Sequence, residues 1–278
     1  MSYRRKHVKN KIRKIKPKKS ILKRPIFWYL ILFLILASAV FYFLLFSDNF
    51  QVKNIIILGN EKVNSKDIEN IVQSNINKRI LAFLSWTLES KSILLVKLEK
   101  LDKEILERFP VIEKTKIDKN LPQTLMLGIT ERKPLGVFCK DGANDQQQCF
   151  LIDKNGVIFE PAFAVPENFS VVRQTLDNKE VFIGEEVIGK NIMEAISKIK
   201  RNLEDNFQIN VKEALVSNPL RLNVKTSENW QIYFNLDEDS DINLQLAKLN
   251  LLLDKQIAPE TRRTLEYIDL RFDRAYYK

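Results

Sequence analysis

The sequence predicts an α+β protein with a single N-terminal transmembrane helix, and three observations support this fold class. Residues 26–47 form an uncharged apolar run, residues 50–134 mix strand-like and helix-like patterns, and the remainder contains short strand patterns with two amphipathic helices. Apolar residues at every second position are typical of half-buried strands, whereas a spacing of three or four is typical of helices. The expected parts are residues 1–24, 25–47, 48–134 and 135–278.

The positive charge of the chain is concentrated at its start. The formal net charge is +10, but residues 1–24 hold 12 Lys or Arg and no acid, which leaves 33 basic and 35 acidic residues in the rest of the chain. A basic nucleic-acid-binding fold is therefore not expected, and no nucleic-acid partner is predicted. We interpret the tail as a topology signal that attracts anionic lipid. Binding of DNA or of a partner is the less favoured alternative, because the tail has almost no aromatic residues that could stack on bases.

The apolar run at residues 26–47 is long enough to cross a membrane. As a helix its 22 residues would span about 33 Å, against a hydrocarbon core of about 30 Å. The basic flank precedes the run, so the positive-inside rule places residues 1–24 in the cytoplasm and residues 48–278 outside. A cleaved signal peptide is the competing interpretation, because Ala37-Ser38-Ala39 resembles a cleavage site. The apolar run continues beyond that site to Phe46 and the basic region is long, so we predict an uncleaved, single-pass signal anchor.

Two cysteines, Cys139 and Cys149, lie on either side of a turn-like stretch in the outer part. A disulfide across a hairpin in an oxidising compartment is one interpretation. Two ordinary strand cysteines are the other, and the sequence leaves the choice open. Two cysteines with no nearby histidine make a poor zinc site, so no metal is predicted.

Residues 48–134 predict a compact unit with the order strand, helix, helix, strand, strand. The strands are expected at residues 50–58, 111–118 and 124–131. One helix is expected to begin at Asn64 or Ser65, and the other carries Leu94, Leu98, Leu101 and Ile105 on one face. Both helices should cover the same face of a three-stranded sheet. The sequence does not decide between two interpretations of residues 77–92: a connector that folds onto the core, or an apolar loop that lies against the nearby bilayer.

Residues 135–278 predict a mostly antiparallel sheet with two packed helices. The helices are expected at residues 191–205 and 241–257, and residues 161–180 are expected to be irregular. Short strands are expected at residues 135–139, 149–153, 156–160, 211–217, 220–226 and 230–236, with a final strand from about residue 264. In that final strand Ile268, Leu270 and Phe272 alternate with charged residues, which is the pattern of a strand with one dry face.

The outer part lacks the residues that most catalytic sites need. The single histidine is His7 in the basic tail, which excludes Ser-His-Asp and Cys-His catalysis outside the membrane. Seven glycines in the whole chain leave no glycine-rich phosphate loop. The acidic run at residues 237–241 lacks the spacing of an EF-hand and is interpreted as a solvated turn before a helix. We therefore predict no catalytic residue, metal or cofactor, and a protein that works by binding.

Four stretches, residues 50–72, 108–134, 150–159 and 267–278, occur in an order that resembles the FtsQ/DivIB family of bacterial cell-division proteins. Residues 50–72 resemble the start of that family's polypeptide-transport-associated (POTRA) domain. Residues 108–134 resemble the next part of that domain, with matches at Phe109, Pro110, Pro122, Thr124, Leu125, Glu131, Arg132 and Pro134. Residues 150–159 resemble the start of the family's β domain, and residues 267–278 resemble its closing strand. The resemblance covers about residues 50–278 and is weaker at 77–92 and 161–190.

The resemblance implies a POTRA domain at residues 48–134, a β domain at 135–278 and a non-enzymatic role in septum formation. The implied location is the inner (plasma) membrane at the division septum, with the N-terminus in the cytoplasm. The implied partners are small bitopic division proteins of the FtsB/DivIC and FtsL types, held mainly by the β domain.

The closing strand is the expected partner site, because an open edge offers unpaired backbone groups to an incoming strand. Phe272 matches an aromatic position of the family's partner site. The alternative is that Ile268, Leu270 and Phe272 merely fill the core. The predicted partner-binding residues are Ile268, Leu270, Arg271, Phe272, Asp273, Arg274, Ala275, Tyr276 and Tyr277. Two other functions stay open: a membrane-anchored enzyme acting on the cell wall, and a POTRA-type transport chaperone for which residues 50–60 would form the free edge.

Overall fold

The structure, a computed structural model, describes residues 25–83, 86–141, 147–164, 169–174, 180–218, 220–237 and 239–278. The predicted basic tail, residues 1–24, lies outside the described residues, as do parts of the predicted turn between the cysteines and of the segment 161–180. The chain divides into two compact units. Unit 1 comprises residues 1–53, 76–96 and 121–123, and unit 2 comprises residues 54–75, 97–120 and 124–278.

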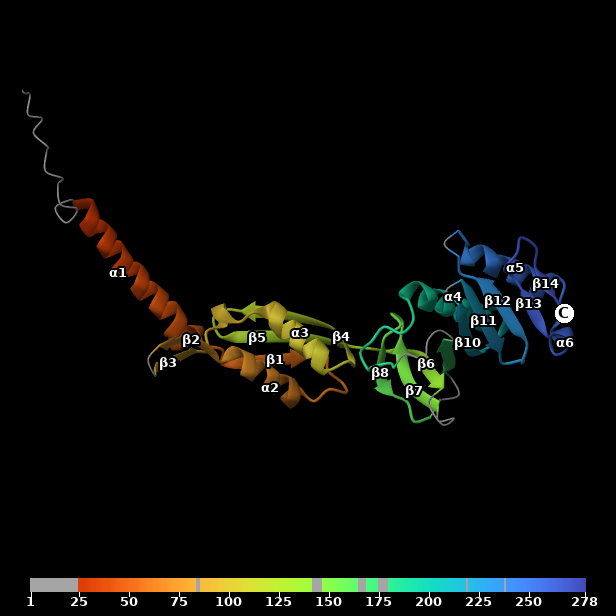
Figure 1. Ribbon diagram of the computed structural model, residues 1–278, viewed down its shortest axis with the longest axis horizontal. Helices are drawn as coiled ribbons and strands as arrows, with labels where there is room; N and C mark the ends of the chain where they lie inside the picture. The colour runs from red at the N-terminus through yellow and green to blue at the C-terminus, as the bar shows by residue number, and fades with distance from the viewer. Residues whose placement is uncertain are drawn as a thin grey trace, which may run out of the picture. The chain divides into compact units, whose positions relative to one another are not determined.

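Unit 1 contains the apolar helix and a β-hairpin. The helix α1 runs from Pro25 to Phe46 and is the one helix in the described part of the chain that is long and apolar enough to cross a membrane. Short 3-10 turns follow at Asp48–Phe50 (η2) and Ile93–Leu95 (η3). Residues 77–92, which the sequence left open, contain the strands β2 (Lys78–Phe83) and β3 (Trp86–Ser90), paired as a two-stranded antiparallel sheet beside the end of α1 (Figure 1).

Unit 2 begins with a small three-stranded sheet in the order β1-β5-β4. Its strands are β1 (Asn54–Leu58), β4 (Ile112–Asn120) and β5 (Thr124–Glu131), and its helices are α2 (Ser65–Ile76) and α3 (Leu98–Arg108). The outer strand β1 is parallel to β5, and β4 is antiparallel to it. Alternate positions of β5 are buried, so one face of the sheet is dry, and both helices contribute fully buried residues such as Ile68 and Leu101. The predicted order of strand, helix, helix, strand, strand is therefore present, with the hairpin inserted between the helices.

The rest of unit 2 is a nine-stranded sheet in the order β14-β13-β12-β11-β10-β9-β6-β7-β8. Its strands are β6 (Pro134–Asp141), β7 (Gln147–Asp153), β8 (Ile158–Pro161), β9 (Ser170–Gln174), β10 (Val211–Asn218), β11 (Arg221–Thr226), β12 (Gln231–Asn235), β13 (Tyr267–Asp269) and β14 (Tyr276–Tyr277). Most pairs are antiparallel, as predicted. Three pairs are parallel: β6 with β9, β9 with β10, and β12 with β13.

Two helices connect parallel neighbours of this sheet. The helix α4 (Lys190–Phe207) lies between β9 and β10 in the chain, and α5 (Ile242–Lys255) lies between β12 and β13, followed by the short α6 (Pro259–Arg262). A parallel neighbour cannot be reached by a tight turn, so the chain crosses over through a helix. The segment 161–180, expected to be irregular, contains the strand β9, and this expectation was wrong for residues 170–174.

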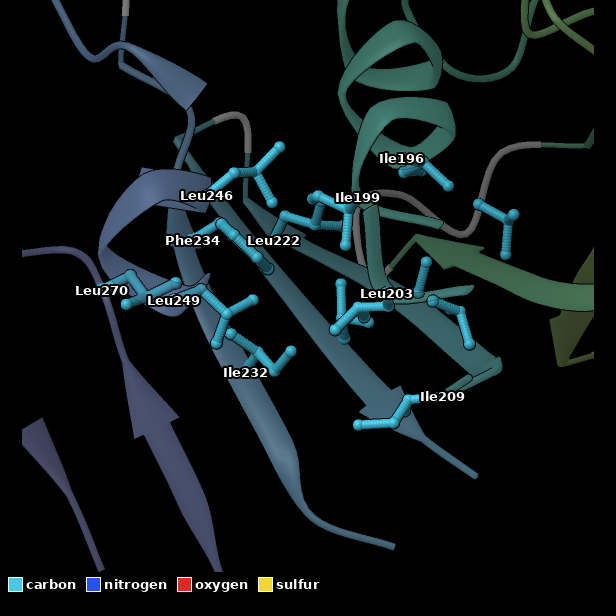
Figure 2. Packing of buried hydrophobic residues seen from close by; sticks show 14 of the residues in the cluster. Ile196, Ile199, Leu203, Ile209, Leu222, Ile232, Phe234, Leu246, Leu249 and Leu270 are labelled. Carbon is cyan, nitrogen blue, oxygen red and sulfur yellow. The ribbon is translucent and has the colours of Figure 1, made fainter. Parts of the chain in front are cut away.

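The core of the large sheet lies beneath α4 and α5. Figure 2 shows Ile199 and Leu203 of α4 and Leu249 of α5 turned toward the strand residues Leu222 and Ile232. All five are fully buried. Because both helices use the same face of β10 to β12, the other face of these strands carries the partly exposed residues of each alternating pattern. This helix-free face continues onto β13.

The predicted final strand is interrupted. The sequence pattern suggested one strand from about residue 264 to the end, whereas β13 stops at Asp269 and the chain bends before β14. The strand β14 then pairs antiparallel with β13 and becomes the last strand of the sheet. The edge of the sheet is therefore β14. The alternating residues Ile268 and Leu270, which suggested an edge strand, lie on or beside β13, one strand further in.

Candidate functional site

The strand β13 anchors the C-terminal segment to the large sheet. Ile268 is paired with Ile232 of β12 in the parallel register, and the backbone N–H of Leu270 donates to the carbonyl of Tyr233 at 3.0 Å. The side chains of Ile268 and Leu270 are 0% and 1% exposed. Both side chains therefore fill the core. This agrees with the alternative interpretation of Ile268 and Leu270 rather than with their prediction as partner-binding residues.

An ion pair between Asp269 and Arg271 organises the bend that follows. The guanidinium donates to both carboxylate oxygens, at 2.9 and 2.5 Å, and the backbone N–H of Arg271 donates to the same carboxylate at 3.1 Å. Burial alone would raise the pKa of Asp269, but the hydrogen bonds and the positive charge of Arg271 outweigh it and hold this pKa below its ordinary value. The side-chain hydrogen bond to Asp269 in turn raises the pKa of Arg271. The bend is thus fixed by a partly shielded, fully ionised pair.

The strand β14 returns along β13 and presents an outer edge. Lys278 and Tyr267 exchange two backbone hydrogen bonds, at 3.1 and 3.3 Å. In an antiparallel ladder, residue pairs that exchange two backbone hydrogen bonds alternate with pairs whose N–H and C=O groups point away from the partner strand. Tyr277, paired with Ile268, therefore directs its N–H and C=O groups away from β13. At the end of the chain Lys278 forms an ion pair with Glu266 at 3.0 Å, a hydrogen bond that raises the pKa of Lys278.

Exposed aromatic rings lie around this edge. The side chains of Phe272, Tyr276 and Tyr277 are 55%, 54% and 48% exposed. The rings of Phe272 and Tyr276 meet edge to face with centroids 6.0 Å apart. Phe272 is therefore neither buried nor isolated, and the interpretation that it fills the core was wrong.

The helix-free face beside the edge carries a stack of arginines and tyrosines. The guanidinium of Arg271 lies 5.4 Å from the ring centroid of Tyr233, and that of Arg221 lies 4.9 Å from the same centroid. The ring of Tyr233 is 5.7 Å from that of Tyr267. Each cation over a ring contributes about 0.5–1 kcal/mol at an exposed site. Rigid aromatic and arginine side chains of this kind are enriched in binding hot spots.

A cavity of about 220 Å³ lies where the bend meets the start of α5. The amine of Lys248 on α5 donates to the carbonyl of Phe272 at 3.1 Å and so ties the helix to the bend. Asp241, the last residue of the acidic run, caps α5 by accepting a hydrogen bond from the N–H of Asn243 at 2.8 Å. This is the turn before a helix that the sequence predicted. The residues that line the cavity include Asp237, Asp239, Asp241, Lys248, Arg271, Phe272 and Asp273.

The structure gathers some predicted residues and adds others. The bend contains Arg271, Phe272, Asp273 and Arg274, and β14 contains both tyrosines. Ala275 packs partly against the core. Sequence reasoning missed four neighbours: Arg221, Tyr233, Lys248 and Tyr267. The signal that could have indicated Tyr233 is its outward position between the buried residues Ile232 and Phe234 of β12.

Cys139 and Cys149 are joined by a disulfide across β6 and β7, where they are direct partners in the antiparallel register. The nearer of its two strands, β6, is six positions away from the edge strand β14 in the order of the sheet. It closes the end of the β6–β7 hairpin whose connecting residues 142–146 lie outside the described residues. Its role is therefore structural and separate from the C-terminal edge.

Residues 142–271 match the model of the family "Cell division protein FtsQ/DivIB, C-terminal". The C-terminal part of the chain therefore resembles an FtsQ/DivIB domain. A search of curated proteins found no match. The matched residues run from the β6–β7 turn to Arg271, so the FtsQ/DivIB domain includes α4, α5 and β13, and β14 lies just beyond the match. The match supports the FtsQ/DivIB family for this chain and, with it, a role in cell division.

Proposed function

We propose that this FtsQ/DivIB protein is a non-enzymatic scaffold of the division septum that binds other division proteins through the edge at β14. Its partners are small bitopic proteins of the FtsB/DivIC and FtsL types. The helix α1 anchors the chain in the inner (plasma) membrane, with the basic N-terminus in the cytoplasm in contact with anionic lipid and the folded part outside.

The observation that carries this proposal is the outward direction of the Tyr277 backbone on the last strand of the sheet. Strand addition to such an edge supplies main-chain hydrogen bonds, and side chains next to the edge supply specificity. The exposed ring of Tyr276 lies on this edge strand, and the exposed ring of Phe272 contacts it from the bend. The edge therefore combines a backbone template with rigid aromatic anchors.

The length and flanks of α1 support the anchoring part of the proposal. The helix has 22 residues, which corresponds to about 33 Å. Most of its large apolar residues, including Phe33 and Phe41, are exposed in the described structure. A helix that is apolar on all sides and uncovered by protein is suited to lipid.

A proline substitution tests strand addition at the edge. Tyr277→Pro removes the outward N–H, and proline is tolerated where the N–H of an edge strand faces solvent. Tyr277→Ala is the matched control, because it removes the ring and keeps the N–H. We expect the proline variant to lose capture of the bitopic partners from detergent extracts at least tenfold, and the alanine variant to lose less. Undiminished capture by a folded Tyr277→Pro protein, and by a folded Phe272→Ala, Ala275→Pro protein, would rule the edge out.

A transport-type chaperone is the second candidate, because β1 also lies at the edge of a sheet. On β1 the side chains of Ile56 and Leu58 are 41% and 56% exposed. A photoreactive residue at position 58 or at position 272 in growing cells separates the two functions. The scaffold predicts a small single-pass membrane protein crosslinked from position 272, whereas the chaperone predicts many different unfolded chains crosslinked from position 58.

No observation favours the membrane-anchored enzyme. That function would call for two close carboxyl groups with raised pKa values in a groove. The two carboxyl groups with shifted pKa values in the described residues, Glu131 and Asp269, are both shifted downward. Each is explained by hydrogen bonds within the fold, so neither supplies a reason to assign a reaction.

A further inference from the structure

The small sheet of β1, β5 and β4 has one buried face and one open face (Figure 1). On the central strand β5, Leu125, Leu127 and Ile129 are at most 5% exposed. Successive residues of a strand point to opposite sides, so Met126 and Gly128 lie on the other side, which we call the open face. All three strands belong to unit 2, and they form a sheet separate from the one that ends at β14.

The outer strand β1 adds two apolar side chains to the open face. In the parallel register Ile56 lies beside Met126, and Leu58 lies beside Gly128. Ile56 and Leu58 are 41% and 56% exposed. A Cβ added to Gly128 would come no closer than 3.7 Å to its nearest neighbour, the carbonyl oxygen of Lys116. The open face therefore carries an apolar patch of Ile56, Leu58 and Met126, with a hollow at Gly128.

The sequence of β1 is typical of a strand that is covered on both faces. Residues 55–58 are Ile-Ile-Ile-Leu without interruption. Such continuous apolar runs occur in parallel strands, which are usually covered on both sides. The strand β1 is parallel to β5, but its residues alternate between exposed and partly buried. Its composition thus suits a second cover, which the described residues do not provide.

The strand β4 gives the open face a basic margin. Lys114, Lys116 and Asp118 are paired in register with residues of β5 that lie on the open face, so they share that face. All three are exposed. Asp118 forms an ion pair with Lys116 at 3.7 Å. Because two lysines face one aspartate, the margin beside the apolar patch is basic.

The dimensions of the open face suit one α-helix. Neighbouring strands are about 4.8 Å apart, so β1 and β4 lie about 10 Å apart across β5. This is about the diameter of a helix with its side chains. A sheet buries an apolar face against helices or against another sheet, and a single helix is enough to cover three strands. A helix with apolar residues at spacings of three and four would match the patch, and acidic residues along its side would complement the lysines.

We propose that the open face is a second partner surface, which binds one amphipathic helix of another protein. The apolar patch receives the apolar side of that helix, and Lys114 and Lys116 pair with its acidic residues. This surface is independent of the proposed edge at β14. A sheet edge binds a strand through backbone hydrogen bonds, whereas this face binds a helix through side chains. The chain then has separate surfaces for two partner segments.

Defined peptides test the chemistry of the open face. The full-length protein in nanodiscs of phosphatidylcholine is titrated with two synthetic helical peptides. Both have the same leucine side, but the polar residues are glutamate in one and lysine in the other. Fluorescence anisotropy gives the two dissociation constants. The basic N-terminal tail is present in every variant, so comparison between variants isolates the open face.

Two double variants and one control locate the binding. Ile56→Thr with Met126→Thr removes two residues of the patch and keeps residues suited to a strand, and we expect it to bind the glutamate peptide at least fivefold more weakly. Leu220→Thr alters a leucine that is 53% exposed on the other sheet and should leave binding unchanged. Lys114→Glu with Lys116→Glu should shift the ratio of the two affinities at least fivefold toward the lysine peptide.

The outcomes of the titrations separate the possibilities. Equal losses in the patch variant and in Leu220→Thr, or an unchanged ratio in the lysine variant, would overturn the proposal. The two lysines are exposed and can be replaced without disturbing the core, so their variant decides the question even where the patch variant unfolds.

A photoreactive residue at position 126 in growing cells tests the partner. We expect one main adduct, whose crosslinked peptide, identified by mass spectrometry, has apolar residues at helical spacing and acidic residues beside them. An adduct with a second copy of the chain, or with many different extended segments, would overturn the helix partner. No adduct from position 126 together with an adduct from position 272 would overturn the open face and leave the β14 edge intact. Tyr277→Pro should leave the adduct from position 126 unchanged, because the two surfaces lie on different sheets.

Discussion

Arg132 and Asp153 form an ion pair, with 2.5 Å between the guanidinium and the carboxylate, that links the three-stranded sheet to the nine-stranded sheet. Arg132 directly follows β5 and also donates to the carbonyl of Pro110 at 2.9 Å. Asp153 is the last residue of β7. Its carboxylate accepts hydrogen bonds from the backbone N–H groups of Asn155 and Val157 in the following turn. The Asp153 side chain is 1% exposed and that of Arg132 is 14% exposed. One buried carboxylate thus holds both the turn and the neighbouring sheet.

Removing this carboxylate should strongly destabilise unit 2. We expect Asp153→Ala to lower the free energy of unfolding by about 3–5 kcal/mol, because it leaves the Arg132 guanidinium and two backbone N–H groups without their partner. Glu160→Ala is the matched control, since the Lys62–Glu160 pair at 2.6 Å has side chains that are 51% and 43% exposed. An exposed pair contributes about 0–1 kcal/mol. Urea unfolding of the full chain in detergent, followed by circular dichroism, measures both, and equal losses would contradict the special role of Asp153.

Local periodicity predicted most elements of the fold but not the strands whose partners are distant in the chain. The helices α4 and α5 and the strands β10 to β12 lie within a few residues of their predicted bounds, because their apolar spacing is set by one buried face. The strand β9 was missed. It is held by parallel pairing to β6 and β10 on either side, and a short stretch carries no sign of such partners.

The candidate site shows the same limit at the level of single residues. The alternation of Ile268, Leu270 and Phe272 continues through Arg271, so the sequence gives no sign that the strand stops at Asp269. The bend depends on the side chain of Asp269 accepting three hydrogen bonds from Arg271. The position of Tyr233 beside Arg271 depends on the register between β12 and β13, which sequence spacing alone does not determine.

Glu131 should make the stability of unit 2 depend on pH. Its carboxylate accepts backbone hydrogen bonds from Glu61, Lys62 and Val63 at 2.9–3.0 Å. Burial raises the pKa of Glu131, but these hydrogen bonds and the charge of Lys62 outweigh it, so the pKa lies below its ordinary value. A lowered pKa means that the stabilisation is complete above the unfolded-state pKa of about 4.3 and is lost as the pH falls through the folded-state pKa.

The variant Glu131→Gln isolates this effect, because it keeps the shape of the side chain and removes its charge. We expect a loss of about 1 kcal/mol at neutral pH, since the site is partly open to solvent. The difference between the two proteins should shrink as the pH is lowered from about 5 toward 3. Urea midpoints measured across this range test the prediction. A difference that stays constant down to the lowest pH would show that the charge of Glu131 does not act through these hydrogen bonds.

The Cys139–Cys149 disulfide should stabilise the β6–β7 hairpin by restricting the unfolded chain. The two cysteines are 10 residues apart in the sequence, and closing so short a loop contributes about 3 kcal/mol in the chain-entropy model. We expect a double Cys139→Ala, Cys149→Ala variant to unfold with a free energy lower by about 2–3 kcal/mol. A reducing agent should destabilise the original chain by a similar amount and leave the variant unchanged. If the reducing agent affected both equally, the disulfide would not be the source of the stability.

The Asp269–Arg271 pair should control the order of the C-terminal edge. Asp269→Asn keeps the side-chain shape but weakens the hydrogen bonds that close the bend, and bonds to a charged group contribute about 1.5–3 kcal/mol. The pKa of Asp269 is held down by Arg271, so this stabilisation is present above the ordinary pKa of about 3.9 and disappears as the pH falls through the folded-state value. Hydrogen exchange of the Lys278 amide, which donates to Tyr267, reports whether β14 stays paired. We expect that amide to exchange at least tenfold faster in Asp269→Asn than in the original chain. Asp273→Asn, in the same bend, is the control and should leave the exchange rate unchanged. Equal protection of the amide in both variants would show that the ion pair does not control the order of β14.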